Sequence, residues 1–440
     1  MSKKVYIETY GCQMNVADSE TVAAIMQSNS FTPVTKISEA DIIIINTCSV
    51  RDNAEQKIWH RLDFLKGFKK RNKHVKVGII GCMAQRVADK LLEHEAVDFV
   101  AGPDAYRAIP ELVNETDIKA SHINTNLDIE ETYSGIVQYK YGENAISGFV
   151  PITRGCNNFC SYCIVPYTRG RERSSSYSDI INEVADLRDK DYKEITLLGQ
   201  NVNSYYFEDS NNKVDFPTLI KMVAETAPDI RIRFTTSHPK DISDALIEVI
   251  AQYDNICNHI HLPVQSGSNK VLKLMNRKYT REWYLERIQK IKSTIPDCGL
   301  SSDIFCGFSG ETETEFLETL DLMNIVEYDS AFLFKYSVRP DTAAAKNLID
   351  DVSEQEKIER LNRLIELQNQ ISLKKNKADI GKTLEVLVEG FSKRSKDYLF
   401  GRTQQSKVVV FADNNFKVGS FINVKITDVS SATLKGIAIN

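Results

Sequence analysis

The 440-residue sequence lacks the marks of a membrane protein, of a secreted protein and of a strongly basic protein. No apolar run approaches the roughly 20 residues that a membrane-spanning helix needs, so no membrane span is expected. The first residues pass into a strand pattern without the apolar core of a secretory signal peptide. With 55 Lys and Arg against 60 Asp and Glu, the net charge of −5 argues against a uniformly basic nucleic-acid binder. A local basic patch is compatible with this balance.

An even set of cysteines is also absent, because the chain has nine. An odd number in a long chain without a secretory signal indicates a reducing compartment, and we expect a cytoplasmic protein. The hydrophobic share of 42% and the charged share of 26% are ordinary for a soluble globular protein. The length suggests two to four domains.

Three of the cysteines, Cys156, Cys160 and Cys163, form a C-x3-C-x2-C motif. Structural cysteines have no reason to cluster on one short loop, whereas thiolates at this spacing suit zinc or an iron–sulfur cluster. A structural zinc site usually has a fourth Cys or His within a few tens of residues, whereas the next candidates downstream are His238 and Cys257. Three ligands without a near fourth favour a four-iron cluster with one iron open to substrate. The three cysteines are therefore the candidate catalytic centre.

The motif has Tyr162 directly before its last cysteine, and it resembles the signature of the radical SAM superfamily. The resemblance implies that S-adenosylmethionine (SAM) binds the open iron and is cleaved by one electron to a 5′-deoxyadenosyl radical. In such enzymes the protein holds the cofactor and excludes water. A low-potential electron donor such as flavodoxin or ferredoxin is implied as a partner.

Four strand patterns alternate with helical patterns in the first third of the chain, at 5–9, 41–46, 75–80 and 97–100. This alternation predicts an N-terminal doubly wound parallel α/β domain. Cys12, Cys48 and Cys82 each follow the carboxyl end of a strand, which is the edge of open α/β sheets where ligands bind. Right-handed crossovers would bring them to one rim, so we predict a second three-cysteine cluster. The alternative is three unrelated buried cysteines.

Two three-cysteine sets in this order resemble the methylthiotransferase family of radical SAM enzymes, whose N-terminal domain holds an auxiliary four-iron cluster. The segment Gly11-Cys12-Gln13-Met14-Asn15 resembles the branch acting on isopentenylated adenosine in tRNA. The branch that modifies an aspartate of a ribosomal protein typically has Gly-Cys-Pro-Lys-Asn instead. The resemblance implies two [4Fe-4S] clusters and methylthiolation of carbon 2 of N(6)-isopentenyladenosine adjacent to the tRNA anticodon.

The same resemblance implies two uses of SAM. One molecule donates a methyl group to a sulfur on the auxiliary cluster, and a second supplies the radical that removes hydrogen from carbon 2. A radical suits this position because an adenine C–H has no useful acidity. A sulfur source, the anticodon stem-loop as a partner and a monomeric enzyme are expected with it. The alternatives are methylthiolation of a ribosomal-protein aspartate by the same chemistry, an N-terminal cluster that only relays electrons, and a non-catalytic zinc-stabilised RNA-binding protein.

Residues 121–141 have the polar composition of an interdomain linker, between an N-terminal domain at 3–120 and a radical SAM core at 142–374. Six strand-like runs predict a (β/α)6 partial TIM barrel in the core, at 149–153, 194–198, 231–235, 259–263, 299–305 and 331–336. Chemistry in such barrels lies on the loops after the strands. By resemblance, we assign Tyr162 to the adenine side of SAM, and Ser237, Gln265 and Asp303 to polar contacts with cofactor or substrate.

Three arginines after the cysteine loop, Arg169, Arg171 and Arg173, are candidate RNA-binding residues because they alternate beside the expected active-site mouth. Such a run can contact RNA phosphates. A solvated or salt-bridged loop is the alternative.

The end of the chain combines a helix pattern at 353–377 with short strand patterns. The strand patterns lie at 383–388, 398–400, 407–411, 421–427 and 433–439, and they suggest a small OB-like β-barrel at 377–440. This region resembles a TRAM domain, the RNA-binding appendage of the family. Lys393, Arg394 and Arg402 give it a basic face, from which we expect modest, salt-sensitive RNA binding.

Overall fold

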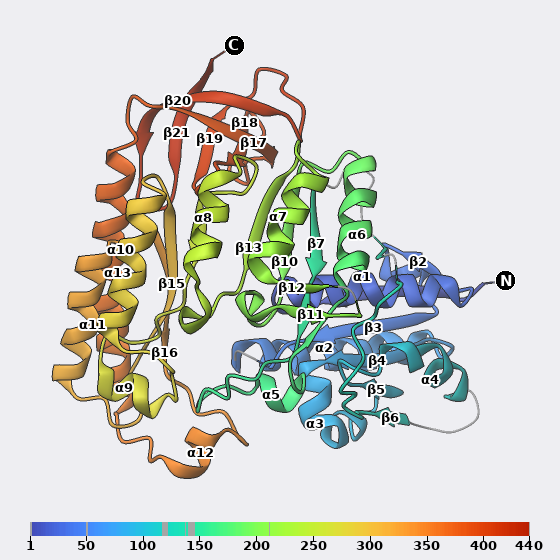
Figure 1. Cartoon of the computed structure of the whole chain (residues 1–440). Helices are drawn as coiled ribbons and strands as arrows, with labels where there is room; N and C mark the ends of the chain where they lie inside the picture. Colours follow the sequence, from blue (N-terminus) through green and yellow to red (C-terminus); the bar gives the residue numbers. More distant parts are fainter. Residues whose placement is uncertain are drawn as a thin grey trace.

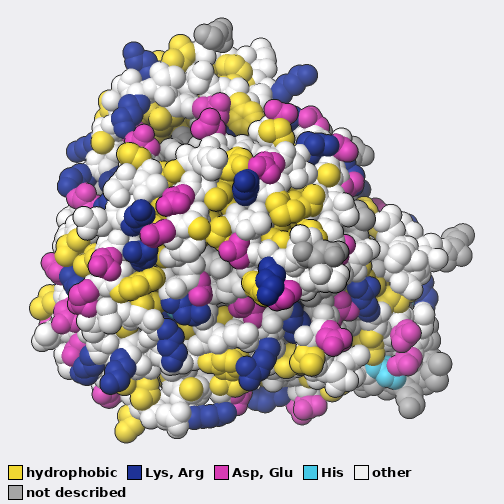
Figure 2. All heavy atoms as spheres, in the orientation of Figure 1, with side chains coloured by type: hydrophobic (Ala, Val, Ile, Leu, Met, Phe, Trp, Pro, Cys, Tyr) yellow, Lys and Arg dark blue, Asp and Glu magenta, His cyan; other side chains and the backbone are white. Residues whose placement is uncertain are grey.

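The computed structural model describes residues 2–49, 52–116, 122–136, 138–139, 146–210 and 212–439. An N-terminal sheet domain, a curved middle sheet ringed by helices and a C-terminal β-barrel lie one after another, with the C-terminal barrel at the top of the view in Figure 1. Figure 2 shows positive and negative side chains interspersed over this face. Among the described residues, no helix is both long and apolar enough to cross a membrane.

The N-terminal domain is a six-stranded sheet in the order β2-β1-β3-β4-β5-β6, and every pairing in it is parallel. Its strands are β1 (Lys4–Thr9), β2 (Thr32–Val34), β3 (Ile42–Thr47), β4 (Lys76–Gly81), β5 (Phe99–Ala101) and β6 (His122–Asn124). Its helices are α1 (Gln13–Ser28), α2 (Asp52–Arg71), α3 (Cys82–Leu92) and α4 (Ile109–Glu115). Every residue of β3 is buried because separate apolar cores cover the two faces of the sheet, which confirms the doubly wound α/β prediction.

The segment predicted as a linker belongs in part to this domain. β6 lies inside 121–141 and pairs with β5 as the edge strand of the sheet. Tyr133 is buried, stacks on Tyr106 at 5.3 Å between ring centroids, and donates its hydroxyl to the Pro103 carbonyl. Because this segment is polar in composition, the sequence analysis missed the three-residue strand β6 and the buried Tyr133. Residues 121, 137, 140 and 141 of the predicted linker lie outside the described residues.

The middle of the chain forms the predicted partial barrel. Its parallel strands are β7 (Ser147–Pro151), β10 (Glu194–Leu198), β13 (Arg231–Thr235), β14 (His259–His261), β15 (Gly299–Cys306) and β16 (Ser330–Lys335). A bridge pairs Ile232 of β13 with Ile256, just before β14, between the sheets β13-β10-β7 and β14-β15-β16. One core of buried aliphatic and aromatic side chains runs through both sheets and their helices.

The outer helices of the barrel are α6 (Tyr177–Asp189), α7 (Phe216–Thr226), α8 (Asp244–Gln252), α10 (Arg281–Thr294) and α11 (Glu313–Val326). Shorter elements are β8 (Thr153–Arg154), α5 (Val165–Thr168), β9 (Arg173–Ser174), β11 (Tyr206–Glu208), β12 (Lys213–Asp215), α9 (Asn269–Leu274) and α12 (Ala343–Asn347). The predicted helix at 353–377 is α13 (Glu354–Lys377), and it begins at a capping box between Ser353 and Glu356. Leu364 and Ile371 of α13 are buried in the barrel's core.

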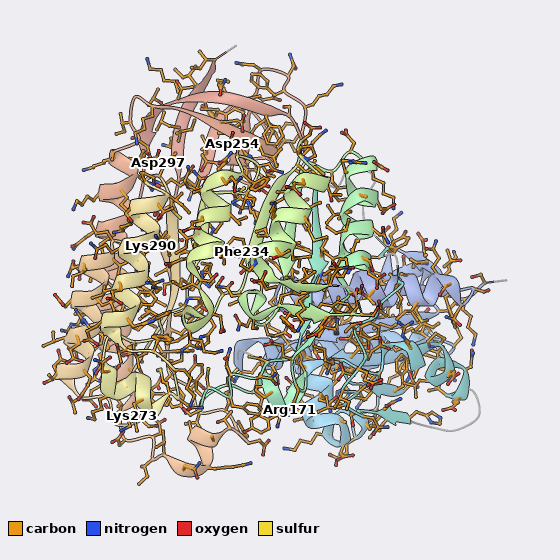
Figure 3. All side chains as sticks on the ribbon, in the orientation of Figure 1. Arg171, Phe234, Asp254, Lys273, Lys290 and Asp297 are labelled. Atoms are coloured by element: carbon orange, nitrogen blue, oxygen red, sulfur yellow. The ribbon has the colours of Figure 1, made fainter. Side chains whose placement is uncertain are left out.

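The C-terminal strands close into a barrel in the order β17-β18-β19-β21-β20, as predicted. They are β17 (Thr383–Phe391), β18 (Tyr398–Arg402), β19 (Val408–Ala412), β20 (Phe421–Val429) and β21 (Leu434–Ile439); residue 440 lies outside the described residues. This barrel packs at the amino ends of the middle strands. Arg231 donates to the Arg402 carbonyl at 2.8 Å, and Gln404 donates to the carbonyl of Asp254, which Figure 3 labels beneath the C-terminal barrel.

Candidate active site between two cysteine loops

Cys12, Cys48 and Cys82 lie at one edge of the N-terminal sheet, as predicted. They follow β1, β3 and β4, which are neighbours in the sheet, with Thr9 opposite Asn46 and Thr47 opposite Gly81. Side chains tie the three turns together, because Asn15 donates to the Thr47 carbonyl, Asn46 donates to the Asn15 carbonyl, and Thr47 Oγ1 donates to the Ile80 carbonyl. Gly11 has φ +144°, and a Cβ there would lie 2.8 Å from Cys48 Cβ. Glycine therefore allows the Cys12 turn to approach Cys48.

Cys156, Cys160 and Cys163 lie on the loop that follows β8, near the carboxyl ends of the barrel strands. Ser161 anchors this loop, since its Oγ donates to the Leu274 carbonyl at 2.8 Å and its N–H donates to the Met275 carbonyl at 3.0 Å. The loop closes on itself through the Cys163 N–H and the Cys160 carbonyl, 3.0 Å apart. The structure thus presents two separate sets of three thiols, one on each domain.

Each set of cysteines has one arginine hydrogen-bonded to a sulfur. Arg277 Nη1 donates to Cys160 Sγ at 3.3 Å, and Arg169 Nε donates to Cys82 Sγ at 3.2 Å. Hydrogen bonds to ligand sulfurs are one of the means by which proteins set the reduction potential of an iron–sulfur cluster.

Burial holds several of these thiols protonated in the absence of metal. It raises the pKa of Cys156 to about 11 and that of Cys163 to about 12. Burial also raises the pKa of Cys82, against the opposing effect of the Arg169 charge. Because metal ligands must be deprotonated, loading iron into these loops releases protons.

Three thiols in each set are the donor type that iron–sulfur clusters use. Within the described ranges, no group of three or more His, Cys, Asp and Glu side chains is placed so that it could hold a metal ion. At the carboxyl ends of three barrel strands, buried polar atoms have no hydrogen-bond partner among the described residues: Gln200 Oε1, Ser237 Oγ and Gln265 Oε1. They follow β10, β13 and β14 in turn. Buried polar atoms are normally satisfied, so these three suit a polar cofactor.

The four residues assigned to SAM or substrate lie at this same end of the barrel. Tyr162 packs edge-on against Phe305, with 5.2 Å between ring centroids. Gln265 donates its N–H to the Asp303 carbonyl at 2.9 Å and accepts from the Phe305 N–H at 2.8 Å. Asp303 Oδ1 lies 3.5 Å from His261 Nε2, and Ser237 is buried just after β13. The structure brings these positions together, and their roles stay predictions.

The arginines predicted to contact RNA do not share one surface. Arg169 and Arg173 are buried, and each is paired with a buried aspartate at 2.7 Å, Asp18 and Asp104 respectively. Neither guanidinium faces solvent, so the salt-bridged alternative holds for both and their assignment to phosphates was wrong. Gly170 has φ +71°, and the chain turns there so that Arg171 is exposed beside α5 (Figure 3). In the C-terminal barrel Lys393 and Arg394 are exposed, whereas Arg402 pairs with Glu389 at 3.0 Å.

Asp18 and Arg154 are two site residues that the sequence analysis missed. Asp18 has no exposed surface, and it accepts from Arg154 Nη1 at 2.9 Å and from Arg169 Nη2 at 2.7 Å. Burial by itself would raise the pKa of Asp18, but the two guanidinium groups outweigh it and hold the pKa below its usual value. A carboxylate among the helical residues that follow Cys12 was the only signal in the sequence.

A cavity of about 380 Å³ lies beside both cysteine loops. Ser49, which follows Cys48, and Ile164, which follows Cys163, both line it. The rest of its wall combines acidic, basic, aromatic and apolar side chains: Glu55, Trp59, Arg86, Val87, Lys90, Val338, Arg339 and Pro340. Glu55 holds Arg86 by two contacts of 2.6 Å, and Arg86 Nε donates to Ser49 Oγ at 3.0 Å. The cavity therefore lies between the two domains, next to one residue from each cysteine loop.

Comparison with known families divides the chain into the same three parts. Residues 4–102 match Uncharacterized protein family UPF0004, residues 150–323 match the Radical SAM superfamily, and residues 377–439 match the TRAM domain.

Curated relatives match over nearly the whole chain. The tRNA-2-methylthio-N(6)-dimethylallyladenosine synthase of Bacteroides fragilis is 59% identical over 436 residues, which cover 99% of this chain and 95% of the relative. Relatives with the same name in Phocaeicola vulgatus and Porphyromonas gingivalis are 59% and 56% identical, again over 99% of this chain and over 96% and 94% of their own lengths.

Solved structures show the same fold at low identity. The radical S-adenosylmethionine methyltransferase TsrM from Kitasatospora setae aligns with a TM-score of 0.59 and 12% identity, over 78% of this chain and 75% of that one. The cobalamin-dependent S-adenosylmethionine radical enzyme OxsB aligns with a TM-score of 0.52 and 12% identity, over 83% and 56%. These likenesses concern the fold alone.

Proposed function

The chain belongs to the radical SAM methylthiotransferases, in the family of tRNA-2-methylthio-N(6)-dimethylallyladenosine synthases, and we propose that it methylthiolates carbon 2 of N(6)-isopentenyladenosine adjacent to the tRNA anticodon. The family uses SAM and [4Fe-4S] clusters, with a second cluster besides the one that cleaves SAM. The observation that carries the proposal is that Ser49, next to Cys48, and Ile164, next to Cys163, line one cavity. A single loop would cleave SAM but would have no second site for the sulfur.

We assign the auxiliary cluster to Cys12, Cys48 and Cys82, and the SAM-cleaving cluster to Cys156, Cys160 and Cys163. We propose 142–374 as the radical SAM core and 377–440 as the TRAM domain, while the N-terminal domain extends past residue 120 to include β6 and Tyr133. When bound, the clusters and SAM supply the methyl group, the sulfur and the 5′-deoxyadenosyl radical. The chain's own task is to hold them apart from water and to present the substrate base.

The polar end of the barrel suits a cationic cofactor. Polar groups of SAM can donate hydrogen bonds to the three unpartnered side-chain oxygens, which belong to Gln200, Ser237 and Gln265. His238 stays neutral, because burial, with Arg277 and Lys240, lowers its pKa to about 2. A neutral His238 beside Ser237 adds no positive charge against the sulfonium of SAM.

The cavity between the loops suits a nucleotide turned out of its stack. Adenine can stack on Trp59, while Lys90 and Arg339 lie in the same wall and can attract phosphates. The pairing of Arg86 with Glu55 and Ser49 fixes the wall beside Cys48. Base-modifying enzymes generally need such a pocket because their target atom is not accessible in a stacked helix.

The remaining partners belong to the same proposal. We propose a low-potential reductant such as flavodoxin or ferredoxin, a separate sulfur source, a monomeric state and a cytoplasmic location. The family resemblance supports all four.

The test compares anticodon stem-loops with and without the N(6)-isopentenyl group, using anaerobically reconstituted enzyme and a chemical reductant. Mass spectrometry of the digested RNA should find the methylthio group on the prenylated loop alone. A peptide carrying the ribosomal-protein aspartate serves as the competing substrate. Activity on the peptide, or on neither RNA, would contradict the substrate assignment.

Trp59→Ala is expected to lower kcat/KM for the prenylated stem-loop by roughly 5- to 150-fold, because stacking of a base on an aromatic ring is worth about 1–3 kcal/mol. Trp59→Phe keeps an aromatic ring and should retain most of the activity. Iron content and thermal unfolding of both variants report on folding. An Ala variant with wild-type kcat/KM would exclude Trp59 as the stacking residue.

Replacing Lys393 and Arg394 together by Ala is expected to raise KM for tRNA and leave kcat unchanged, because both side chains are exposed between β17 and β18 of the C-terminal barrel, which packs at the end of the middle strands opposite the cysteine loops. Loss of two phosphate contacts should reduce the slope of log affinity against log salt concentration by about 1.5 to 2 in magnitude. Titration of labelled tRNA at several salt concentrations measures the slope, with Lys290→Ala on α10 as the control (Figure 3). An unchanged slope would remove these residues from the RNA interface.

A further inference from the structure

Arg169 belongs to the middle domain in sequence, yet its guanidinium ends on the N-terminal domain. Nε donates to Cys82 Sγ at 3.2 Å, and Nη2 donates to Asp18 Oδ2 at 2.7 Å. The side chain is 5% exposed. Its third nitrogen, Nη1, is buried and has no acceptor among the described residues. Because buried donors are normally paired, the unused Nη1 donor of Arg169 suits an acceptor that is present only when a cluster is bound at the neighbouring cysteines.

Asp18 extends this contact to the other cysteine loop. Its second oxygen accepts from Arg154 Nη1 at 2.9 Å, and Arg154 lies two residues before Cys156. Arg154 also donates to the Pro103 carbonyl at 3.2 Å and lies 4.6 Å from the Tyr133 ring centroid. One carboxylate therefore joins two arginines, one hydrogen-bonded to Cys82 and the other on the strand that leads to Cys156.

The charges of this group are unbalanced. Arg154, Arg169 and Asp18 together carry one net positive charge, and all three are almost fully buried. Such a charge is costly unless an anion lies beside it. A four-iron cluster held by thiolates is anionic, and Cys82 brings one of its sulfurs against Arg169. The excess charge is thus placed where the auxiliary cluster would compensate it.

We propose that Arg169 is a positioning residue of the auxiliary cluster. Arg169 donates its Nε–H to the Cys82 sulfur and thereby raises the reduction potential of that cluster. Through Asp18 and Arg154, Arg169 also holds the two cysteine loops at a fixed separation. The inference rests on the proposed function, because it requires iron at Cys12, Cys48 and Cys82. A positive charge and an N–H donor favour the reduced, more negative cluster. Arg277 occupies the matching place at Cys160 and would act on the other cluster.

Arg169→Gln and Arg169→Lys separate this role from a structural one. The Gln variant removes the Arg169 charge and leaves Asp18 and Arg154 as a pair of opposite charges. Neither remaining buried charge is therefore left without a counter-ion. The Lys variant keeps the charge and loses the fork that reaches Asp18 and Cys82 together. Arg171→Lys, at an exposed position two residues away, is the matched control for the redox measurement.

The experiment is an anaerobic redox titration of the full-length reconstituted enzyme, followed by electron paramagnetic resonance. Arg169→Gln should shift the auxiliary cluster alone to a more negative potential, Arg169→Lys should shift it less, and Arg171→Lys should shift neither cluster. Methylthio transfer by Arg169→Gln should fall about 10- to 100-fold, as for other partners of metal ligands. Unchanged potentials in a fully loaded Arg169→Gln enzyme, or equal shifts of both clusters, would overturn the proposal.

A second measurement requires no substitution at Arg169. Enzyme labelled with ¹⁵N-arginine, in a Cys156/Cys160/Cys163→Ala background that retains only the auxiliary cluster, should show nitrogen hyperfine coupling to the reduced cluster. Absence of that coupling would overturn the proposal even if the Arg169 variants failed to fold. Neither readout uses tRNA, so an enzyme inactive on the prenylated stem-loop that still shows the coupling and the shift would refute the proposed function alone.

Discussion

Replacing Cys12, Cys48 and Cys82 together by Ala is expected to abolish methylthio transfer while SAM cleavage continues. The three cysteines lie at one edge of the N-terminal sheet, and the C-x3-C-x2-C loop proposed to cleave SAM is held separately by Ser161. Iron after anaerobic reconstitution should fall from about eight to about four per chain. RNA product and 5′-deoxyadenosine, measured in the same reaction, distinguish the two activities.

The complementary Cys156/Cys160/Cys163→Ala variant should also retain about four irons and should lose both activities. Cys298→Ala is the control, because that cysteine is buried before β15, at the end of the barrel opposite the cysteine loops. If SAM cleavage disappeared along with methylthio transfer in the N-terminal variant, the N-terminal cluster would be a relay for electrons. If wild-type enzyme held only four irons and the second variant none, the auxiliary cluster and the proposed mechanism would both fail.

Asp18→Asn is expected to destabilise the enzyme by about 3–5 kcal/mol, because it leaves Arg154 and Arg169 buried without their counter-ion. The side chain keeps its size, so packing changes little and the loss is electrostatic. Urea unfolding of the iron-free protein, with hydrogen exchange of α1 as a local readout, measures the effect apart from cluster binding.

The effect of Asp18 should depend on pH in a defined direction. Its pKa in the folded protein lies below the ordinary value of 3.8, so its stabilisation is complete above that pH and is lost as pH falls below it. The difference in the free energy of unfolding between wild type and Asp18→Asn should therefore become smaller as the pH falls. Asp186→Asn, which breaks an exposed pair with Lys190, is the control and should change stability little. An Asp18→Asn protein as stable as wild type at neutral pH would show that the two guanidinium groups find other partners.

Local pattern was enough to locate most strands and the cysteine loops. The middle strands at 194–198 and 231–235 coincide with β10 and β13, because strands buried on both faces form continuous apolar or alternating runs that end at turn residues. Cys12, Cys48 and Cys82 could be placed together because parallel strands all end at the same edge of a sheet. Membership of the family followed from the same residues.

Arg169 shows where that reasoning stops. Three arginines at alternate positions have the same composition whether they face RNA or a buried carboxylate. Only Asp18, on a helix of another domain, decides that Arg169 turns inward, and the two residues are 151 positions apart. The edge strand β6 and the buried Tyr133 were missed for a related reason, because their stabilising contacts come from β5 and Tyr106 rather than from their own neighbours.

The sequence by itself determined the three domains, the two sets of three thiols and the chemistry that such thiols support, since these depend on residue type, spacing and periodicity. Only the tertiary structure decided that residues next to both sets line one cavity, that a single aspartate joins the arginines beside them, and that the C-terminal barrel packs at the opposite ends of the barrel strands. Ion pairs and domain contacts between distant residues arise when the chain folds, because burial removes water and leaves each charge dependent on the partner that the fold brings to it.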